Sequence, residues 1–252
     1  MSTAGLGRML VTGGAKGVGA AIVKALALAG HDVDFTYRAS GSAGEALAET
    51  LTAETGRQVQ ALPLDLADKD AVDVFSTQAE DETYYGLVHN AGQSYDALAL
   101  MMGQDQAEAA MQVNFWSMTR LVKSVVRPMV RARSGRIIAI GSVAALQGNP
   151  GNAAYAASKG ALLSYLRTLT VETAARGITV NYIAPGFIDT DMMAPYAAYR
   201  ANMEKQIPAG RFAAPEDIAA FVAFLASPAA GYMTGAVLPV DGGLTARISV
   251  QR

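Results

Sequence analysis

Short runs of apolar residues alternate along the chain with longer stretches in which apolar residues recur every three or four positions. The short runs predict strands and the longer stretches predict helices. The predicted strands span residues 9–12, 31–37, 59–64, 86–89, 136–141, 178–184 and 237–240, and the predicted helices span residues 18–29, 43–55, 68–80, 104–133, 153–176 and 215–226. This alternation is typical of an α/β fold in which helices cover both faces of a parallel sheet. We therefore predict a single doubly wound domain over residues 1–252.

The amino-acid composition limits the classes of protein to which this chain can belong. Hydrophobic residues make up 51% of the chain and charged residues 17%, which favours a globular fold over disorder. The formal net charge of -2 argues against a nucleic-acid-binding protein, which needs a basic face for phosphates. The sequence contains no apolar run of about 18 residues, the length that a membrane helix requires. Because the first residues lack a signal-peptide layout, we expect a cytoplasmic protein with neither a nucleic-acid nor a membrane partner.

Residues suited to metal or thiol chemistry are scarce. The chain has no cysteine, which excludes disulfides, thiolate metal sites and thiol nucleophiles. The two histidines, His31 and His89, are too few for a multi-histidine metal site, and we expect both to be structural. We therefore predict no metal site.

A glycine-rich turn joins the first predicted strand to the first predicted helix. Gly13, Gly17 and Gly19 allow a tight turn, and backbone N–H groups at a helix N-terminus can bind a pyrophosphate. The spacing of these glycines differs from the general G-x-G-x-x-G fingerprint, so an ordinary strand–helix connection is the alternative. The predicted cofactor contacts in the turn are Gly13, Ala15, Lys16, Gly17, Val18 and Gly19.

The end of the second predicted strand bears on the choice of dinucleotide. NAD sites usually carry an acid here, which hydrogen-bonds the ribose hydroxyls and would repel a 2′-phosphate. In this chain Tyr37 and Arg38 take its place, and Lys16 adds a second positive charge. We therefore predict NADPH/NADP+ as the cofactor. Asp32 and Asp34, earlier in the same strand, oppose this prediction unless they point elsewhere.

Two further strand ends suit the adenosine half of a dinucleotide. Asp65 and Leu66 follow the third predicted strand, where a carboxylate can accept a hydrogen bond from the adenine amino group. Asn90, Ala91 and Gly92 follow the fourth, where small residues leave room for the cofactor. Each segment alone is also a common turn. Their regular placement favours a site, because open α/β sheets bind ligands at the carboxyl ends of their strands.

Four residues are candidates for catalysis. Tyr155 and Lys159 are four apart in a predicted helix, so they share one face, and a nearby ammonium stabilises a phenolate. Ser142 follows the fifth predicted strand, and Asn114 is a polar residue in an apolar stretch of helix, where a buried amide needs partners. Each also has an ordinary alternative: a chance spacing, a loop or cap serine, or a plain helix asparagine.

The order of these elements resembles the short-chain dehydrogenase/reductase family, from about residue 9 to residue 243. The order is the turn at 12–19, residues 90–92, Asn114, Ser142, Tyr155 with Lys159, and residues 185–186. Within the family, the chain is most similar to bacterial 3-oxoacyl-[acyl-carrier-protein] reductases, on the segments 136–143, 148–149, 177–181, 184–192 and 241–243. The resemblance implies a Rossmann-like fold and an NADPH-dependent reduction of a ketone to a secondary alcohol.

The resemblance also implies a role for each catalytic candidate. Tyr155 is expected to donate a proton to the carbonyl oxygen, and Lys159 to lower the pKa of Tyr155 and to hold the nicotinamide ribose. Ser142 is expected to polarise the carbonyl. Asn114 is expected to anchor a water chain that resupplies protons through Lys159. The physical chemistry agrees, because the charge of a developing alkoxide would meet two hydroxyl donors.

The segment after the sixth predicted strand is expected to meet the nicotinamide and the substrate. By resemblance, Pro185 and Gly186 begin this segment, and Ile188 and Thr190 lie near the carboxamide of the nicotinamide. Residues 189–211 have an irregular pattern rich in methionine and tyrosine, which favours a substrate lid. A packed helical hairpin is the alternative.

Two arginines match the positions of carrier-docking residues in the acyl-carrier reductases. An acyl carrier protein is acidic, so basic residues such as Arg133 and Arg176 are expected near the mouth of the site. Both also fall at predicted helix C-termini, where a cation is favoured in any protein. By resemblance, the helices at 104–133 and 153–176 form the main subunit contact, which implies a homotetramer or a homodimer.

Three functions remain open at this point. The first is reduction of a 3-oxoacyl thioester, carried by acyl carrier protein, to its 3-hydroxyacyl form. The second is oxidation or reduction of a free small-molecule alcohol or ketone. The third is a non-catalytic NADPH-binding protein, which the complete catalytic set disfavours. Residues 94–102 and the tail at 247–252 depart from the housekeeping reductases, so fatty-acid, polyketide and polyene pathways all stay open.

Overall fold

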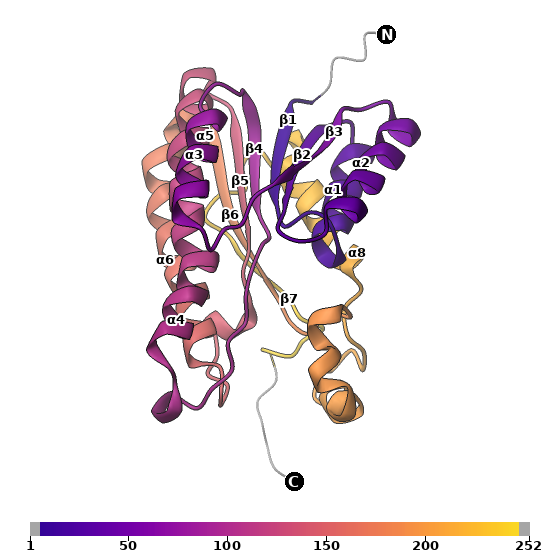
Figure 1. Ribbon diagram of the computed structural model, residues 1–252, viewed down its shortest axis with the longest axis vertical. Helices are drawn as coiled ribbons and strands as arrows, with labels where there is room; N and C mark the ends of the chain where they lie inside the picture. The colour runs from indigo at the N-terminus through magenta and orange to yellow at the C-terminus, as the bar shows by residue number, and fades with distance from the viewer. Residues whose placement is uncertain (1–5, 247–252) are drawn as a thin grey trace.

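Seven parallel strands form one sheet in the computed structural model, which describes residues 6–246 (Figure 1). The strands are β1 (Arg8–Thr12), β2 (Asp32–Tyr37), β3 (Val59–Pro63), β4 (Tyr84–His89), β5 (Gly135–Ile140), β6 (Ile178–Pro185) and β7 (Val237–Val240). Their order in the sheet is β3-β2-β1-β4-β5-β6-β7, so the chain winds outward from β1 in one direction and from β4 in the other. The predicted doubly wound fold is confirmed. The predicted tail at 247–252 lies outside the described residues.

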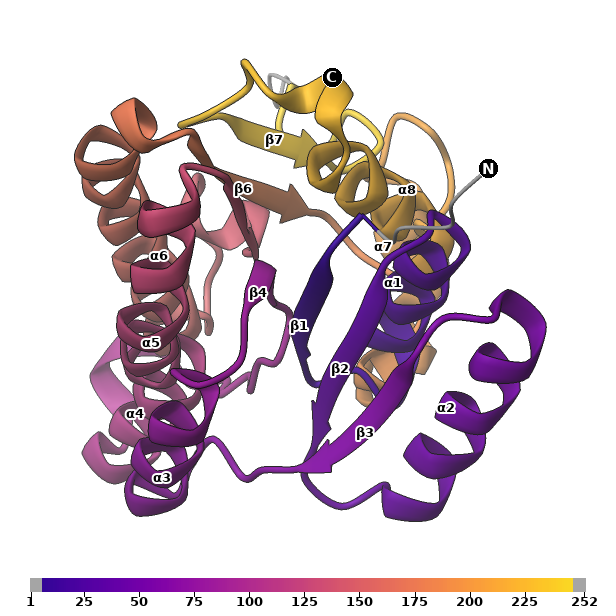
Figure 2. The same cartoon turned by 90° about the horizontal axis from the view of Figure 1, so that it is seen from above.

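Helices cover both faces of this sheet (Figure 2). The helices are α1 (Gly17–Leu28), α2 (Gly41–Thr55), α3 (Lys69–Ala79), α4 (Gln104–Met111), α5 (Ser117–Ala132), α6 (Ala153–Thr173), α7 (Arg200–Glu204) and α8 (Pro215–Ala226). On one face lie α1, α2 and α8, and on the other lie α3, α4, α5 and α6. Over residues 6–246, no helix has both the length and the apolarity to cross a membrane.

The apolar run of each central strand is explained by burial on both faces. In β1, Leu10 joins the core against α5 and α6, whereas Met9 and Val11 join the core against α1 and α8. All three side chains have no exposed surface. Because all strands are parallel, their carboxyl ends meet at one edge of the sheet, and the turns that follow them gather there.

The long helix predicted over 104–133 is interrupted in the structure. A π-helical turn, Gln112–Trp116, separates α4 from α5. Polar side chains inside the turn bind neighbouring backbone: Gln112 Nε2 donates to Leu66 O at 3.1 Å, and Ser117 Oγ donates to Val113 O at 2.7 Å. The extra residue per turn redirects the side chains that follow, and such turns are frequent at functional sites.

A polar cluster lies at the opposite edge of the sheet, where the strands begin. Asp34 is only 3% exposed, and its carboxylate accepts a hydrogen bond from Tyr84 Oη at 2.8 Å and faces Arg8 Nη1 at 3.4 Å. Burial is the main effect on this carboxyl and raises its pKa, while the bond from Tyr84 lowers it. The hydrogen bond from Tyr84 therefore offsets part of the free-energy cost of burying the ionised carboxylate of Asp34.

Replacement of Tyr84 by phenylalanine is expected to lower the free energy of unfolding at neutral pH by about 1–3 kcal/mol, because a buried acceptor loses its donor. A carboxyl group whose pKa is raised in the folded protein lowers the free energy of unfolding only at a pH above the ordinary Asp pKa of the unfolded chain. The difference in stability between the variant and the unaltered protein should therefore shrink as the pH falls into that range. Urea denaturation at several pH values measures this difference. Tyr232→Phe, at a fully exposed tyrosine, is the control. A deficit independent of pH would contradict the role given to Asp34.

Candidate active site

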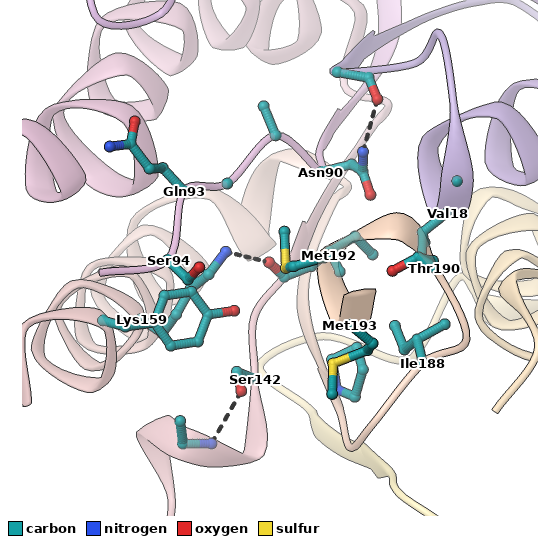
Figure 3. A pocket seen from close by; sticks show the side chains of 18 of the residues that line it. Val18, Asn90, Gln93, Ser94, Ser142, Lys159, Ile188, Thr190, Met192 and Met193 are labelled. Atoms are coloured by element: carbon teal, nitrogen blue, oxygen red, sulfur yellow. Dashed lines mark hydrogen bonds between the residues drawn. The ribbon is translucent and has the colours of Figure 1, made fainter. Parts of the chain in front are cut away.

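A cleft of about 1190 Å³ lies at the carboxyl edge of the sheet. It is lined by every residue that the sequence predicted to contact the cofactor, from Gly13 to Thr190, and by Ser142. Figure 3 shows Ser142 and Lys159 on one side of it, with Met193, Ile188 and Thr190 across from them. The topology thus brings together residues that are far apart in the sequence.

The glycine-rich turn closes tightly against the end of β4. Gly13 has a φ of 68°, and a Cβ atom there would lie within 3.1 Å of Ala91. The side chain of Asn90 holds the turn in place: its Nδ2 donates to Thr12 O at 3.2 Å and to Gly13 O at 3.0 Å. The helix that follows, α1, has no acidic residue in its first turn and no side-chain cap. Its N–H groups are therefore suited to a pyrophosphate.

The end of β2 presents Tyr37 and Arg38 to the cleft. The two aspartates that opposed an NADPH site are engaged elsewhere. Asp34 is bound by Tyr84 and Arg8 in the first half of the strand, and Asp32 Oδ1 accepts a hydrogen bond from Gln58 N at 3.0 Å. A cation in the place of the usual acid suits a 2′-phosphate.

The ends of β3 and β4 line the middle of the cleft. Asp65 Oδ1 accepts a hydrogen bond from Ala67 N at 2.9 Å, and Leu66 O is held by the π-turn. Gly92 lies directly against the catalytic candidates, because a Cβ atom there would come within 3.3 Å of Lys159 Nζ. A small residue at this place keeps the ammonium and the cleft in contact.

Tyr155 and Lys159 lie one turn apart on α6, as the spacing predicted. Lys159 is 2% exposed, and its Nζ donates to Ile140 O, the last residue of β5, at 2.9 Å. The same Nζ lies 5.7 Å from the centre of the Tyr155 ring. Ser142 follows β5 and lies close enough to Tyr155 to lower the pKa of that residue, and its Oγ accepts a hydrogen bond from Ala144 N at 3.1 Å.

Burial dominates the acid–base properties of this pair. It lowers the pKa of Lys159 to about 8. It also raises the pKa of Tyr155, against the lowering effect of the Ser142 hydroxyl, and the carboxylate of Asp96 raises it further. The pKa of Tyr155 is therefore raised, whereas the sequence led us to expect that Lys159 lowers it. A raised pKa keeps the tyrosine protonated at neutral pH, which is the form that can donate a proton.

Asn114 lies in the π-turn, outside the lining of the cleft, with its side chain fully engaged. Its Oδ1 accepts from Gln93 N at 2.8 Å, while its Nδ2 donates to Gln93 O at 2.9 Å and to Ser158 Oγ at 2.8 Å. The amide therefore ties the loop after β4 to helix α6, next to Lys159. The expected water chain remains a prediction.

Tyr182, a buried residue of β6, supports the catalytic candidates and was missed by the sequence analysis. Its hydroxyl accepts a hydrogen bond from Ser142 N at 3.0 Å and donates to Lys159 O at 3.3 Å. The ring occupies the space beside Gly141, where a Cβ atom would overlap it. Tyr182 is 23 positions from Lys159 and 40 positions from Ser142 in the sequence. No local sequence pattern therefore indicates this role of Tyr182.

His89 is structural, as expected, but it connects the two halves of the site. Thr12 Oγ1 accepts from Asn90 N and Ala91 N, both at 3.1 Å, so its own proton must point to His89 Nδ1, at 3.1 Å. His89 Nε2 therefore carries the ring proton and donates to Asn114 O at 3.2 Å. Burial lowers the pKa of this histidine to about 3, so the ring is neutral.

The segment predicted as a lid forms a 3-10 turn, Asp191–Tyr199, followed by the short α7. Met192, Met193, Tyr196 and Met203 line the cleft from this segment. At its base, Arg200 binds both carboxylate oxygens of Asp189, at 2.7 and 2.8 Å, and lies 4.7 Å from the ring centre of Phe212. The Tyr196 hydroxyl donates to Asp96 across the cleft.

The two predicted docking arginines lie together but away from the cleft. Arg133 ends α5 and Arg176 ends the turn after α6, and Arg133 Nη2 donates to Ala175 O at 3.0 Å. Both precede strands, β5 and β6, so they lie at the amino edge of the sheet, whereas the cleft lies at the carboxyl edge. Within one chain they do not ring the mouth of the site. Among the described residues, no group of acidic and histidine side chains could hold a metal ion.

Comparisons with known proteins agree over nearly the whole chain. A family model described as Enoyl-(Acyl carrier protein) reductase matches residues 13–245. A curated relative, the 3-oxoacyl-[acyl-carrier-protein] reductase FabG of Chlamydia trachomatis serovar D, is 41% identical over 241 residues, covering 93% of this chain and 96% of the relative.

Solved structures show the same architecture. One from Beutenbergia cavernae, described as an NAD(P)-dependent gluconate 5-dehydrogenase with bound NADP, is 36% identical with a TM-score of 0.91, covering 97% of this chain and 98% of the other. A blue fluorescent protein from a metagenomic library, in complex with NADPH, is 37% identical with a TM-score of 0.88, covering 96% of this chain and 99% of the other. The chain therefore belongs to the short-chain dehydrogenase/reductase family, as an NAD(P)-dependent oxidoreductase of carbonyl and hydroxyl groups.

Proposed function

We propose that this protein reduces a 3-oxoacyl thioester, carried by acyl carrier protein, to the 3-hydroxyacyl form with NADPH. The observation that carries the proposal is the presence of two hydroxyls, those of Tyr155 and Ser142, beside the buried ammonium of Lys159 in the same cleft as the glycine-rich turn. Two hydroxyl donors can share the charge that develops on a carbonyl oxygen during reduction.

The residues present fit NADPH. The N–H groups at the start of α1 would hold the pyrophosphate, and Arg38 with Lys16 would bind the 2′-phosphate. Ile188 and Thr190, across the cleft from Lys159, would contact the nicotinamide. When bound, the cofactor supplies a hydride.

The chain's own residues manage the proton and the developing charge. Tyr155 gives its hydroxyl proton to the substrate oxygen, and its raised pKa keeps that proton available at neutral pH. Ser142 donates a hydrogen bond to the same oxygen. Lys159, held by Ile140 O, places a positive charge next to the phenolate that Tyr155 becomes. Asn114 fixes the wall of the site around Lys159 through Gln93 and Ser158.

The substrate side of the cleft favours an acyl chain. Met192, Met193 and Met203 provide flexible apolar surface from the lid segment at 189–211. The 41% identity to a 3-oxoacyl-[acyl-carrier-protein] reductase supports the same choice. A second candidate is a free ketone or alcohol, because the Beutenbergia cavernae structure at 36% identity is described as a gluconate dehydrogenase.

Docking of an acyl carrier protein needs a second copy of the chain in this proposal. Arg133 and Arg176 lie at the edge of the sheet opposite the cleft, so a carrier touching them would enter the cleft of a neighbouring subunit. A homotetramer or homodimer through α4, α5 and α6 would supply that neighbour. We propose a cytoplasmic location and a single catalytic domain over the whole chain.

The direct test is NADPH oxidation with acetoacetyl groups on acyl carrier protein and on N-acetylcysteamine. We expect turnover of both, with Tyr155→Phe losing about 100-fold or more in kcat because the proton donor is gone. Loss of activity with the carrier substrate alone in Arg133→Ala/Arg176→Ala would support docking. Failure of the unaltered protein to reduce either thioester, while still binding NADPH, would favour a free ketone.

The cofactor preference is expected to depend on Arg38. Arg38→Asp removes a partner of the 2′-phosphate and adds repulsion, so the KM for NADPH should rise about tenfold or more, with the KM for NADH unchanged or lower. Initial rates with both cofactors measure the effect. Lys24→Asp, at an exposed lysine on the outer face of α1, is the matched control. Equal changes for both cofactors would contradict the assignment.

The reduction is expected to slow as the pH rises. Lys159 has a pKa lowered to about 8, so its positive charge is present below that pH and is lost above it. Tyr155 stays protonated over the same range, because its pKa is raised. The pH profile of kcat/KM for the thioester should therefore fall near pH 8. A profile that stays flat well above this value would show that the charge of Lys159 is not required.

A further inference from the structure

Asp96 occupies a fixed position at the substrate end of the cleft. Its Oδ1 accepts a hydrogen bond from Asn152 Nδ2 at 2.7 Å, and its other carboxylate oxygen accepts from the Tyr196 hydroxyl of the lid. The next residue, Ala97, pairs with Asn152 as an isolated parallel bridge, and its N–H donates to Gly151 O at 2.8 Å. The loop after β4 is thus attached to the start of helix α6, which carries Tyr155.

Asp96 has two hydrogen-bond donors as partners, Asn152 Nδ2 and the Tyr196 hydroxyl. Asn152 is the residue that precedes α6, so the carboxylate also lies near the positive end of that helix. Its negative charge reaches the reaction centre, because Asp96 is one of the groups that raise the pKa of Tyr155.

The charges that line the cleft are unevenly divided. Of its cations, Lys16 and Arg38 belong to the glycine-rich turn and the end of β2, and Lys159 is 2% exposed beneath Gly92. On the substrate side, the loop after β4 and the lid contribute the acids Asp96 and Asp191. A substrate that carries a carboxylate beside its carbonyl would meet negative charge there.

We propose that Asp96 is a specificity residue, which makes the site select neutral carbonyl substrates and reject those with a carboxylate next to the reacting group. Thioesters and esters of 3-oxo acids belong to the accepted class. Free 3-oxo acids belong to the rejected class. The inference rests on the proposed function, in which the substrate is a thioester.

Repulsion between like charges is the physical basis of this selection. Asp96 is exposed, so water and salt screen it when the cleft is open. A bound substrate under the lid displaces water and strengthens the interaction. A neutral substrate carries no charge for Asp96 to repel, so discrimination between the two substrates is created by a repulsive element.

The test compares acetoacetate with ethyl acetoacetate, which have the same carbonyl and differ in charge. The unaltered protein should prefer the ester. Asp96→Asn removes the charge, keeps one acceptor oxygen for Asn152 Nδ2 and offers an amide N–H to the Tyr196 hydroxyl. The value of kcat/KM for acetoacetate should therefore rise about tenfold, and that for the ester should change less than about threefold. Higher salt should narrow the preference of the unaltered protein.

Two further variants separate charge from structure. Tyr196→Phe removes the lid contact but leaves the charge of Asp96, so the preference for the ester should persist. Asp105→Asn removes an exposed carboxylate in the first turn of α4, outside the residues that line the cleft, and should leave the preference unchanged. A gain for acetoacetate in either variant as large as in Asp96→Asn would overturn the proposal.

Failure of this inference is distinct from failure of the proposed function. Equal kcat/KM for acetoacetate and its ester, together with turnover of the acetoacetyl thioester, would overturn the role of Asp96 alone. Absence of thioester turnover would overturn the proposed function. The charge effect would then be read from quenching of the fluorescence of bound NADPH by acetoacetate and by the ester, in the unaltered protein and in Asp96→Asn. Equal affinities in both proteins would overturn the inference as well.

Discussion

The buried ammonium of Lys159 sets the conditions that the rest of the active site must satisfy. A charged group that is 2% exposed needs a polar partner, and Ile140 O supplies one from the end of β5. That partner is in reach only because the parallel sheet places the end of β5 beside α6. The small Gly92 admits the ammonium to the cleft, and Tyr182 fixes the backbone of Lys159 relative to Ser142. Lys159 and Ser142 are therefore held by backbone contacts, which preserve their spacing.

The cofactor side and the catalytic side are joined by hydrogen bonds whose directions are determined. Thr12 Oγ1 uses its acceptor capacity on two N–H groups from the end of β4, which forces its proton toward His89. His89 then has a single arrangement, with its Nε2 proton on Asn114 O. Because burial keeps the ring neutral, this arrangement does not change near physiological pH. The turn that would hold the pyrophosphate and the π-turn beside Lys159 are thus connected by one chain of hydrogen bonds.

The sequence predicted the fold and most of the cleft, because both follow from local patterns. Alternating apolar runs and helical periodicity gave the doubly wound sheet, and that topology alone gathers the strand ends. The π-turn at Gln112–Trp116 escaped prediction, since one added residue leaves the helical pattern almost unchanged. Tyr182 escaped because its partners are distant in the chain. Arg133 was placed correctly at a helix end, but which edge of the sheet it occupies requires the topology.

The charges around the cleft divide it into a positive end, suited to cofactor binding, and an acidic end, where proton donation takes place in the proposed function. Arg38 and Lys16 suit a phosphorylated dinucleotide, so the cofactor end must be positive, whereas the chemistry at Tyr155 requires a protonated acid. A carboxylate such as Asp96 raises the pKa of Tyr155 and thereby favours that acid form. The same charge opposes an anionic substrate. Proton donation and substrate choice are therefore coupled through one side chain, and both favour a neutral carbonyl compound on the substrate side of the cleft.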